Sequence, residues 1–174
     1  VGGHGTSDRT LSGTIYRVAP KGFKPVVQKL NLHTQTGQIE ALRSPAINTR
    51  YLGFSRLKEA GEEAIAPLFQ LAGDRNPYVA ARAVWLLAQL GQAGEKAISM
   101  LLEEEVKGGG DPQTRILIFR SFRRAKHPGM MDLARRLAAD SSPAVRREVA
   151  FYLRNKDATP SVISVLVELA KHYD

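Results

Sequence analysis

The sequence predicts an all-α fold in which about four helix pairs stack into an α–α superhelix, preceded by a short extended or strand segment. Three observations lead to this class. A capping residue followed by proline recurs at a regular interval, helical spacing of apolar side chains follows each such start, and a break then precedes a second apolar helix.

The regular starts are the first of these observations. They fall at Ser44-Pro45, Asn76-Pro77, Asp111-Pro112 and Ser142-Pro143, so the prolines recur at intervals of 32, 35 and 31 residues. Ser, Asn and Asp accept hydrogen bonds from the free N–H groups of a first helical turn. Proline fits the next position because its missing N–H has no partner there. A period of this length is typical of stacked helical hairpins, which bury their apolar faces against one another.

The apolar side chains after each start have helical spacing. The first helices carry Ile47, Tyr51, Phe54 and Leu57; Val79, Ala83, Leu86 and Leu90; Ile116, Phe119 and Phe122; and Val145, Val149, Tyr152 and Leu153. The breaks are expected at 60–61, 91–94, 127–129 and 158–160, and a second apolar helix follows each break.

Two domains are expected along the chain. Residues 1–33 are rich in glycine, and the alternation from Thr14 to Val18 predicts one β-strand. A lone strand is not stable in water, so it must pair with a segment outside this chain or lie against the helices, and we expect it to be the end of a preceding domain. The chain starts at Val1, which indicates either a removed leader or, as we favour, a piece of a longer protein. Residues 34–174 form the predicted helical domain, with a short leading helix at about 37–43.

Composition excludes several classes of site. The chain is 43% hydrophobic and 24% charged, as globular domains are, and no apolar run approaches the roughly 20 residues that span a bilayer. It has no cysteine, which excludes disulfides, thiolate zinc sites and a covalently attached c-type haem. The net charge of +8 favours acidic partners, nucleic acid among them.

One arginine follows each proline by a few residues, at Arg50, Arg82, Arg115 and Arg146. Together with openings such as segment 142–147, SPAVRR, this pattern resembles HEAT repeats over about residues 40–174. The resemblance implies a structural role for these arginines between repeats, with acidic or carbonyl partners. The candidate acidic partners are Asp74, Asp111 and Asp140.

A second resemblance concerns segments 8–10 and 12–22, which are similar to the last strand of a glucose/sorbosone dehydrogenase-type β-propeller. Segments 81–91 and 146–150 resemble the HEAT section that follows such a propeller in large bacterial membrane-bound dehydrogenase-like proteins. The resemblance implies that 1–33 is the remnant of an upstream propeller and that the protein is exported or periplasmic, with the cytoplasm as the alternative. The dehydrogenase activity and haem of that group belong to other domains, so neither is expected of these residues.

We expect no catalytic, cofactor-binding or metal-binding residues. His4, His33, His127 and His172 lack metal-ligand spacing. Glu103, Glu104 and Glu105 are consecutive, so on a helix they point in different directions and cannot converge on one substrate atom.

The candidate interaction surface is a set of arginines in the second half of the chain. It comprises Arg120, Arg123, Arg124, Arg135 and Arg136, with Arg154 nearby. The spacing of the first three places them on one helix face, which could bind phosphates. Phe119 and Phe122 are interpreted as core residues, and Trp85 as an anchor between repeats.

The sequence therefore predicts a non-catalytic scaffold that either holds flanking domains in fixed relation or binds a partner protein on the surface of its second helices. The alternative is a basic HEAT-like module that binds nucleic acid.

Overall fold

The computed structural model describes residues 18–24 and 29–172, in which helices between residues 35 and 170 are joined by short loops and there is no strand. The all-α class predicted from the sequence is confirmed. The α-helices are α1 (Gln35–Arg43), α2 (Ile47–Ala60), α3 (Ile65–Ala72), α4 (Pro77–Leu87), α5 (Gly91–Lys107), α6 (Pro112–Ala125), α7 (Met130–Leu137), α8 (Pro143–Leu153) and α9 (Pro160–Ala170). A 3₁₀ turn, η1 (Gly61–Ala64), joins α2 to α3.

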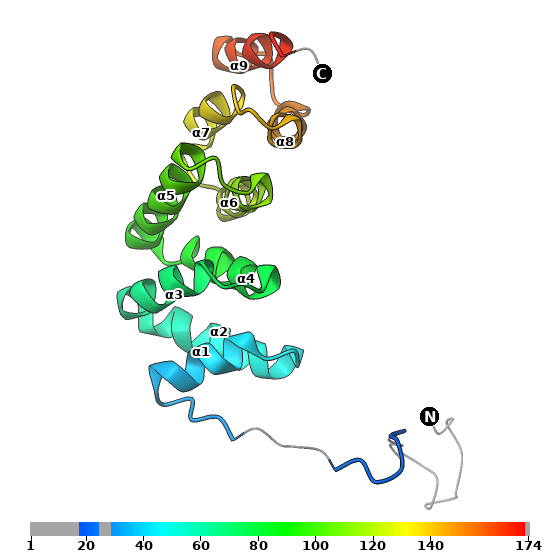
Figure 1. Ribbon diagram of the computed structural model, residues 1–174. Coiled ribbons are helices and arrows are strands. Elements are labelled where there is room, and N and C mark those ends of the chain that lie inside the picture. Colours follow the sequence, from blue (N-terminus) through cyan, green and yellow to red (C-terminus); the bar gives the residue numbers. More distant parts are fainter. Residues whose placement is uncertain (1–17, 25–28, 173–174) are drawn as a thin grey trace, which may run out of the picture.

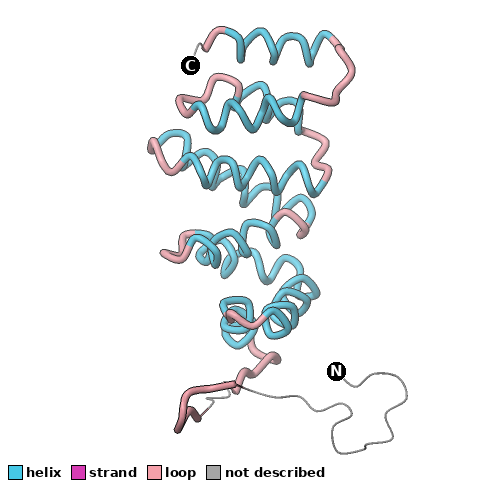
Figure 2. Tube along the Cα trace, turned by 90° about the vertical axis from the view of Figure 1, so that its right-hand side faces the viewer, coloured by secondary structure: helices cyan, strands magenta, loops and turns pink. Residues whose placement is uncertain are grey.

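The helices form two layers of an elongated, bowed column (Figure 1). Helices α3, α5, α7 and α9 follow one another in one layer, and α4, α6 and α8 in the other, while α1 and α2 close one end. Figure 2 shows the helices lying across the long axis of the column. The column is bowed, and α4, α6 and α8 lie on its concave side. We call the exposed surface of α2, α4, α6 and α8 the inner face.

Two of the four predicted cap-proline starts act through the side chain of the capping residue. Asn76 accepts from the N–H of Tyr78, and Asp111 accepts from the N–H of Gln113. Ser142 is the N-cap residue of α8 but makes no side-chain cap bond. The start predicted at Ser44 is wrong, because Ser44 ends α1 and its hydroxyl accepts from the N–H of Ala46, so α2 begins only at Ile47.

The break predicted at residues 91–94 is also displaced. Helix α4 ends at Leu87 and α5 starts at Gly91, so this stretch is the first turn of α5. A Cβ on Gly94 would lie 2.0 Å from the carbonyl oxygen of Leu87. Gly94 therefore allows a close approach between α5 and the end of α4, whereas Gly91 starts α5 with a positive φ of 64°.

A single core runs between the two layers. Phe119 and Phe122 belong to it, as the sequence predicted, with 0% and 3% of their surface exposed. Helix α2 departs from its predicted orientation: Leu57 is fully buried, whereas Ile47 and Tyr51, which share its predicted apolar face, are 71% and 68% exposed.

Gly53 explains the orientation of α2. A Cβ at this position would lie 2.6 Å from the carbonyl oxygen of Gln38 and 2.6 Å from the backbone nitrogen of Leu42. Helix α2 therefore packs against α1 through its glycine side, in backbone-to-backbone contact. This contact turns the start of α2 so that its first apolar side chains point away from the core.

Of the N-terminal segment, the structure describes residues 18–24 and 29–33. The strand predicted from Thr14 lies outside the described residues, except for Val18, which is an exposed loop residue. Residues 18–24 contain one turn and no regular element. None of the helices in the described ranges combines the length and apolar character needed to cross a bilayer.

Candidate interaction surface

The five arginines of the predicted interaction surface do not form one surface. Arg120, Arg123 and Arg124 are exposed on α6, in the inner layer. Arg135 and Arg136 are exposed on α7, in the opposite layer (Figure 1). The sequence places them close together along the chain, but the hairpin that joins α6 to α7 separates them in space.

Two of the α6 arginines share one carboxylate. Nη2 of Arg120 donates to Oε2 of Glu148 at 2.7 Å, and Nη1 of Arg123 lies 3.7 Å from Oε1 of the same residue. The side chain of Glu148 is only 7% exposed. The hydrogen bond from Arg120 holds the pKa of Glu148 below its ordinary value, against the opposing effect of burial, and the charges of Arg120, Arg123 and Arg147 act in the same direction.

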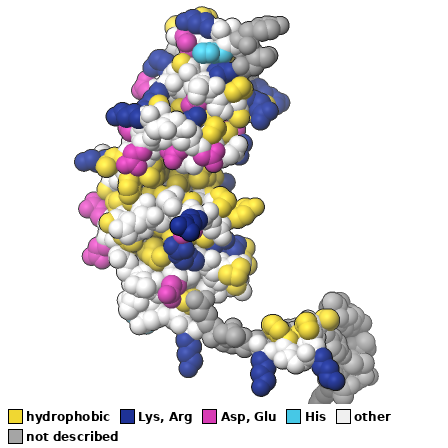
Figure 3. Space-filling model, in the orientation of Figure 1, with side chains coloured by type: hydrophobic (Ala, Val, Ile, Leu, Met, Phe, Trp, Pro, Cys, Tyr) yellow, Lys and Arg dark blue, Asp and Glu magenta, His cyan; other side chains and the backbone are white. Residues whose placement is uncertain are grey.

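The α7 arginines are also paired. Arg135 donates to Asp132 at 2.6 Å and to the hydroxyl of Ser161 on α9, and Arg136 forms an ion pair with Glu103 on α5. In Figure 3, basic and acidic side chains are interspersed over this view of the molecule and do not form a continuous basic stripe. Local carboxylates thus offset much of the positive charge that the arginine count suggests.

The four arginines that follow the prolines make three kinds of contact. Arg115 pairs with Asp140 in the next hairpin, with both side chains 5% exposed. Arg82 donates through Nη1 to the carbonyls of Leu42, Arg43 and Ser44 at the end of α1, at 2.9, 3.0 and 3.2 Å.

The remaining two donate within their own hairpin. Arg50 donates to the carbonyl of Pro45 at 2.7 Å, and Arg146 donates to the carbonyl of Asp140 at 2.6 Å. Of the three candidate acidic partners, only Asp140 is paired with one of these arginines. Asp74 forms its ion pair with Arg43, and Asp111 caps α6.

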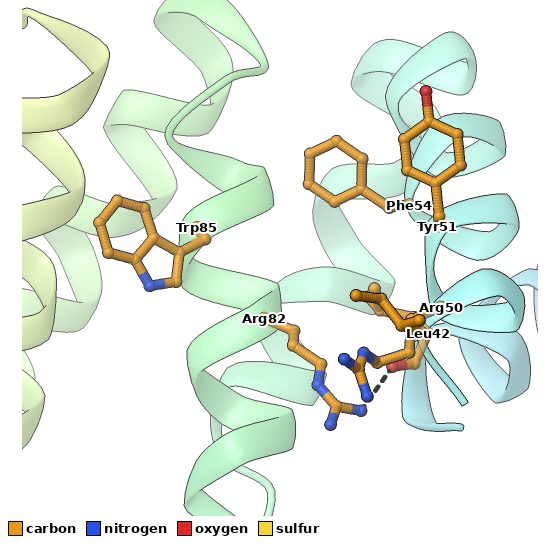
Figure 4. A pocket seen from close by; sticks show the side chains of 7 residues that line it. Leu42, Arg50, Tyr51, Phe54, Arg82 and Trp85 are labelled. Atoms are coloured by element: carbon orange, nitrogen blue, oxygen red, sulfur yellow. Dashed lines mark hydrogen bonds between the residues drawn. The ribbon is translucent and has the colours of Figure 1, made fainter. Parts of the chain in front are cut away.

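An apolar groove lies at the α2–α4 end of the inner face. It has a volume of about 350 Å³ and is lined by Leu42, Ile47, Arg50, Tyr51, Phe54, Arg82 and Trp85. Figure 4 shows Tyr51 and Phe54 projecting from α2, and Arg82 and Trp85 from α4. This groove could not be predicted from helical spacing, because the spacing shows which side of a helix is apolar but not which part of that side a neighbouring helix covers.

Two further grooves have fewer aromatic side chains in their lining. One, of about 460 Å³ on α6 and α8, is lined by Arg120, Arg123, Glu148, Phe151, Arg154 and Asn155. Another, of about 530 Å³, lies between α3 and α5 on the second helices, where the sequence placed the partner surface. Ile65, Phe69 and Met100 are among its lining residues.

Of the described histidines, His127 has the most defined surroundings. Its Nδ1 accepts from the N–H of Gly129 at 2.9 Å, and its Nε2 lies 3.1 Å from Glu95. The ring also packs against Phe122. Within residues 18–24 and 29–172, no group of three or more His, Cys, Asp or Glu residues is placed to hold a metal ion.

Comparison of the chain with protein-family models, curated proteins and solved structures finds no significant match. The resemblances to HEAT repeats and to propeller-linked dehydrogenase-like proteins therefore stay predictions.

Proposed function

We propose that this chain is a non-catalytic protein-interaction module, a helical scaffold that binds a flanking domain or another chain through its inner face. The observation that carries the proposal is the exposure of Ile47 and Tyr51 beside the half-buried Phe54 and Trp85. Clustered apolar side chains at the surface mark interaction sites, and aromatic residues and arginine are enriched at such sites.

The proposal moves the partner surface from the second helices to the first helices. The α3–α5 groove on the second helices is also apolar, but the inner-face groove combines three aromatic side chains with two arginines. We do not favour the nucleic-acid alternative, because Arg120, Arg123 and Arg136 face carboxylates and the arginines lie in two layers. Membership of an exported dehydrogenase-like protein rests on the sequence resemblance alone.

A peptide-display selection tests the proposal without assuming any ligand chemistry. A random peptide library is selected against the intact chain, and each enriched peptide is measured against an Ile47→Ser/Tyr51→Ser variant. We expect enriched peptides that lose binding to this variant and keep binding to Tyr78→Ser, since Tyr78 is an even more exposed tyrosine (75%, against 68% for Tyr51) outside the groove. A selection that enriches nothing, or only peptides indifferent to the groove variant, would overturn the proposal.

A further inference from the structure

At its α1 end, beside Leu42, the inner-face groove is bordered by two guanidinium groups that meet without a carboxylate between them. Nη1 of Arg50 and Nη1 of Arg82 both donate to the carbonyl oxygen of Ser44, at 3.5 and 3.2 Å. Figure 4 shows the two groups side by side. In the part of the chain that the structure describes, neither arginine forms an ion pair, in contrast to Arg115 with Asp140.

Each of these guanidinium groups has N–H donors that are not used within the described structure. The hydrogen bonds of Arg50 and Arg82 to described residues all leave from Nη1, so Nε and Nη2 of both have no acceptor there. A guanidinium presents five N–H donors in a planar fork that matches the two oxygens of a carboxylate. Partial burial lowers the pKa of Arg82, and the charge of the neighbouring Arg50 acts in the same direction.

The walls beside the guanidinium pair are apolar. Tyr51 and Phe54 come from α2, and Ile47 is exposed at the start of α2. Trp85 also lines the groove from α4, with its indole ring turned away from Tyr51 and Phe54 (Figure 4). A bare inorganic anion would use the two arginines and leave these walls in water. A ligand that also covers the walls must carry a large apolar group close to its negative charge.

We propose that this groove binds an acidic peptide segment, with an Asp or Glu carboxylate held between Arg50 and Arg82 and a neighbouring aliphatic or aromatic side chain packed against Tyr51 and Phe54. The inference rests on the proposed function and deepens it by naming the partner's chemistry. The net charge of +8 works in the same direction, because it attracts acidic segments over a longer range.

Fluorescence anisotropy with defined peptides tests the inference. The probe is a short fluorescein-labelled peptide that alternates aspartate with leucine and phenylalanine. It is measured at about 0.15 M salt, where longer-range attraction is screened. Two matched peptides carry asparagine in place of aspartate, or serine in place of the apolar residues. We expect both replacements to weaken binding by about tenfold or more, since hydrogen bonds to charged groups and buried apolar side chains each contribute on this scale.

Matched protein variants locate the binding. Arg50→Gln and Tyr51→Ser should each weaken binding of the probe by about tenfold, as expected when a charge-assisted contact or an aromatic anchor is lost. Arg56→Gln removes the same charge from the same helix outside the groove, and Tyr78→Ser removes an exposed tyrosine elsewhere, so both should leave binding unchanged. Circular dichroism of each variant confirms that it is folded.

Three outcomes would overturn the inference. The asparagine peptide could bind as tightly as the aspartate peptide, the groove variants could bind like the controls, or a labelled single-stranded oligothymidine could bind more tightly than the peptide and lose that affinity in Arg50→Gln. If the display selection yields groove-dependent peptides without a carboxylate, the inference fails while the proposed function stands. If both experiments yield no binding, both fail.

Discussion

Arg115 on α6 donates hydrogen bonds to both carboxylate oxygens of Asp140, which lies in the loop between α7 and α8. Nε donates to Oδ2 at 2.8 Å and Nη2 donates to Oδ1 at 3.0 Å, with both side chains 5% exposed. The remaining Nη1 donates to the carbonyl of Gly110 at 2.6 Å. One guanidinium thus connects the loop before α6 to the loop before α8.

Loss of one member of this buried pair should destabilise the fold strongly. Arg115→Met leaves the carboxylate of Asp140 buried without its partner, and we expect the free energy of unfolding to fall by about 3–5 kcal/mol. Urea denaturation at neutral pH measures the change. Arg135→Met is the matched control, because its pair with Asp132 is exposed and should contribute less than about 1 kcal/mol. Equal effects of the two substitutions would show that the buried pair does not stabilise the stack.

The ion pairs of Glu148 predict a pH dependence. Its pKa is lowered in the folded state from an ordinary value of 4.5, so its contribution to stability is present above that value and is lost as the pH falls through the folded pKa. Glu148→Gln should lower the free energy of unfolding by about 1–3 kcal/mol at neutral pH, because a charge-assisted hydrogen bond is lost. The difference from the unmodified chain should shrink as the pH is lowered below 4.5.

Urea denaturation at several pH values measures this difference. Glu104→Gln serves as the control, since Glu104 is exposed. If the difference in the free energy of unfolding between the unmodified chain and Glu148→Gln stayed constant with pH, the ion pairs of Glu148 would not be the source of its contribution to stability.

The α1–α2 contact predicts that Gly53→Ala is destabilising. The new Cβ would lie 2.6 Å from two backbone atoms of α1, so the helices must separate. We expect a loss of about 1–3 kcal/mol, the usual cost of overpacking, although alanine is the better helix former. Thermal unfolding measures the change. Gly73→Ala should be nearly neutral, because its Cβ meets its nearest atom at 3.5 Å. Full tolerance of Gly53→Ala would mean that α1 and α2 do not pack through this glycine.

The orientation of α2 predicts unequal effects along one apolar stripe. Ile47→Ser should change stability by less than about 0.5 kcal/mol, since Ile47 is 71% exposed, whereas Leu57→Ala should cost about 2–5 kcal/mol, since Leu57 is fully buried. Urea denaturation of the two variants compares them directly. Similar costs at both positions would place Ile47 in the core, and the groove would not exist.

The all-α class and most of the starts of the first helices could be predicted from the sequence, because caps, prolines and apolar spacing act within a few residues of each other. Asn76 and Asp111 cap the helices that they precede, and Phe119 and Phe122 are buried as their spacing predicts. These features depend on local hydrogen bonding and on which side of one helix is apolar.

The position of the candidate surface, in contrast, depends on how the helices pack against one another. Whether Ile47 and Tyr51 face the core depends on the close approach of α2 to α1 at Gly53, which no spacing along α2 encodes. Likewise, Arg120 meets Glu148 across 28 residues, while Arg50 and Arg82 meet each other at the end of α1. Charge and apolarity are properties of residues, but their exposure and pairing are set by which helices become neighbours.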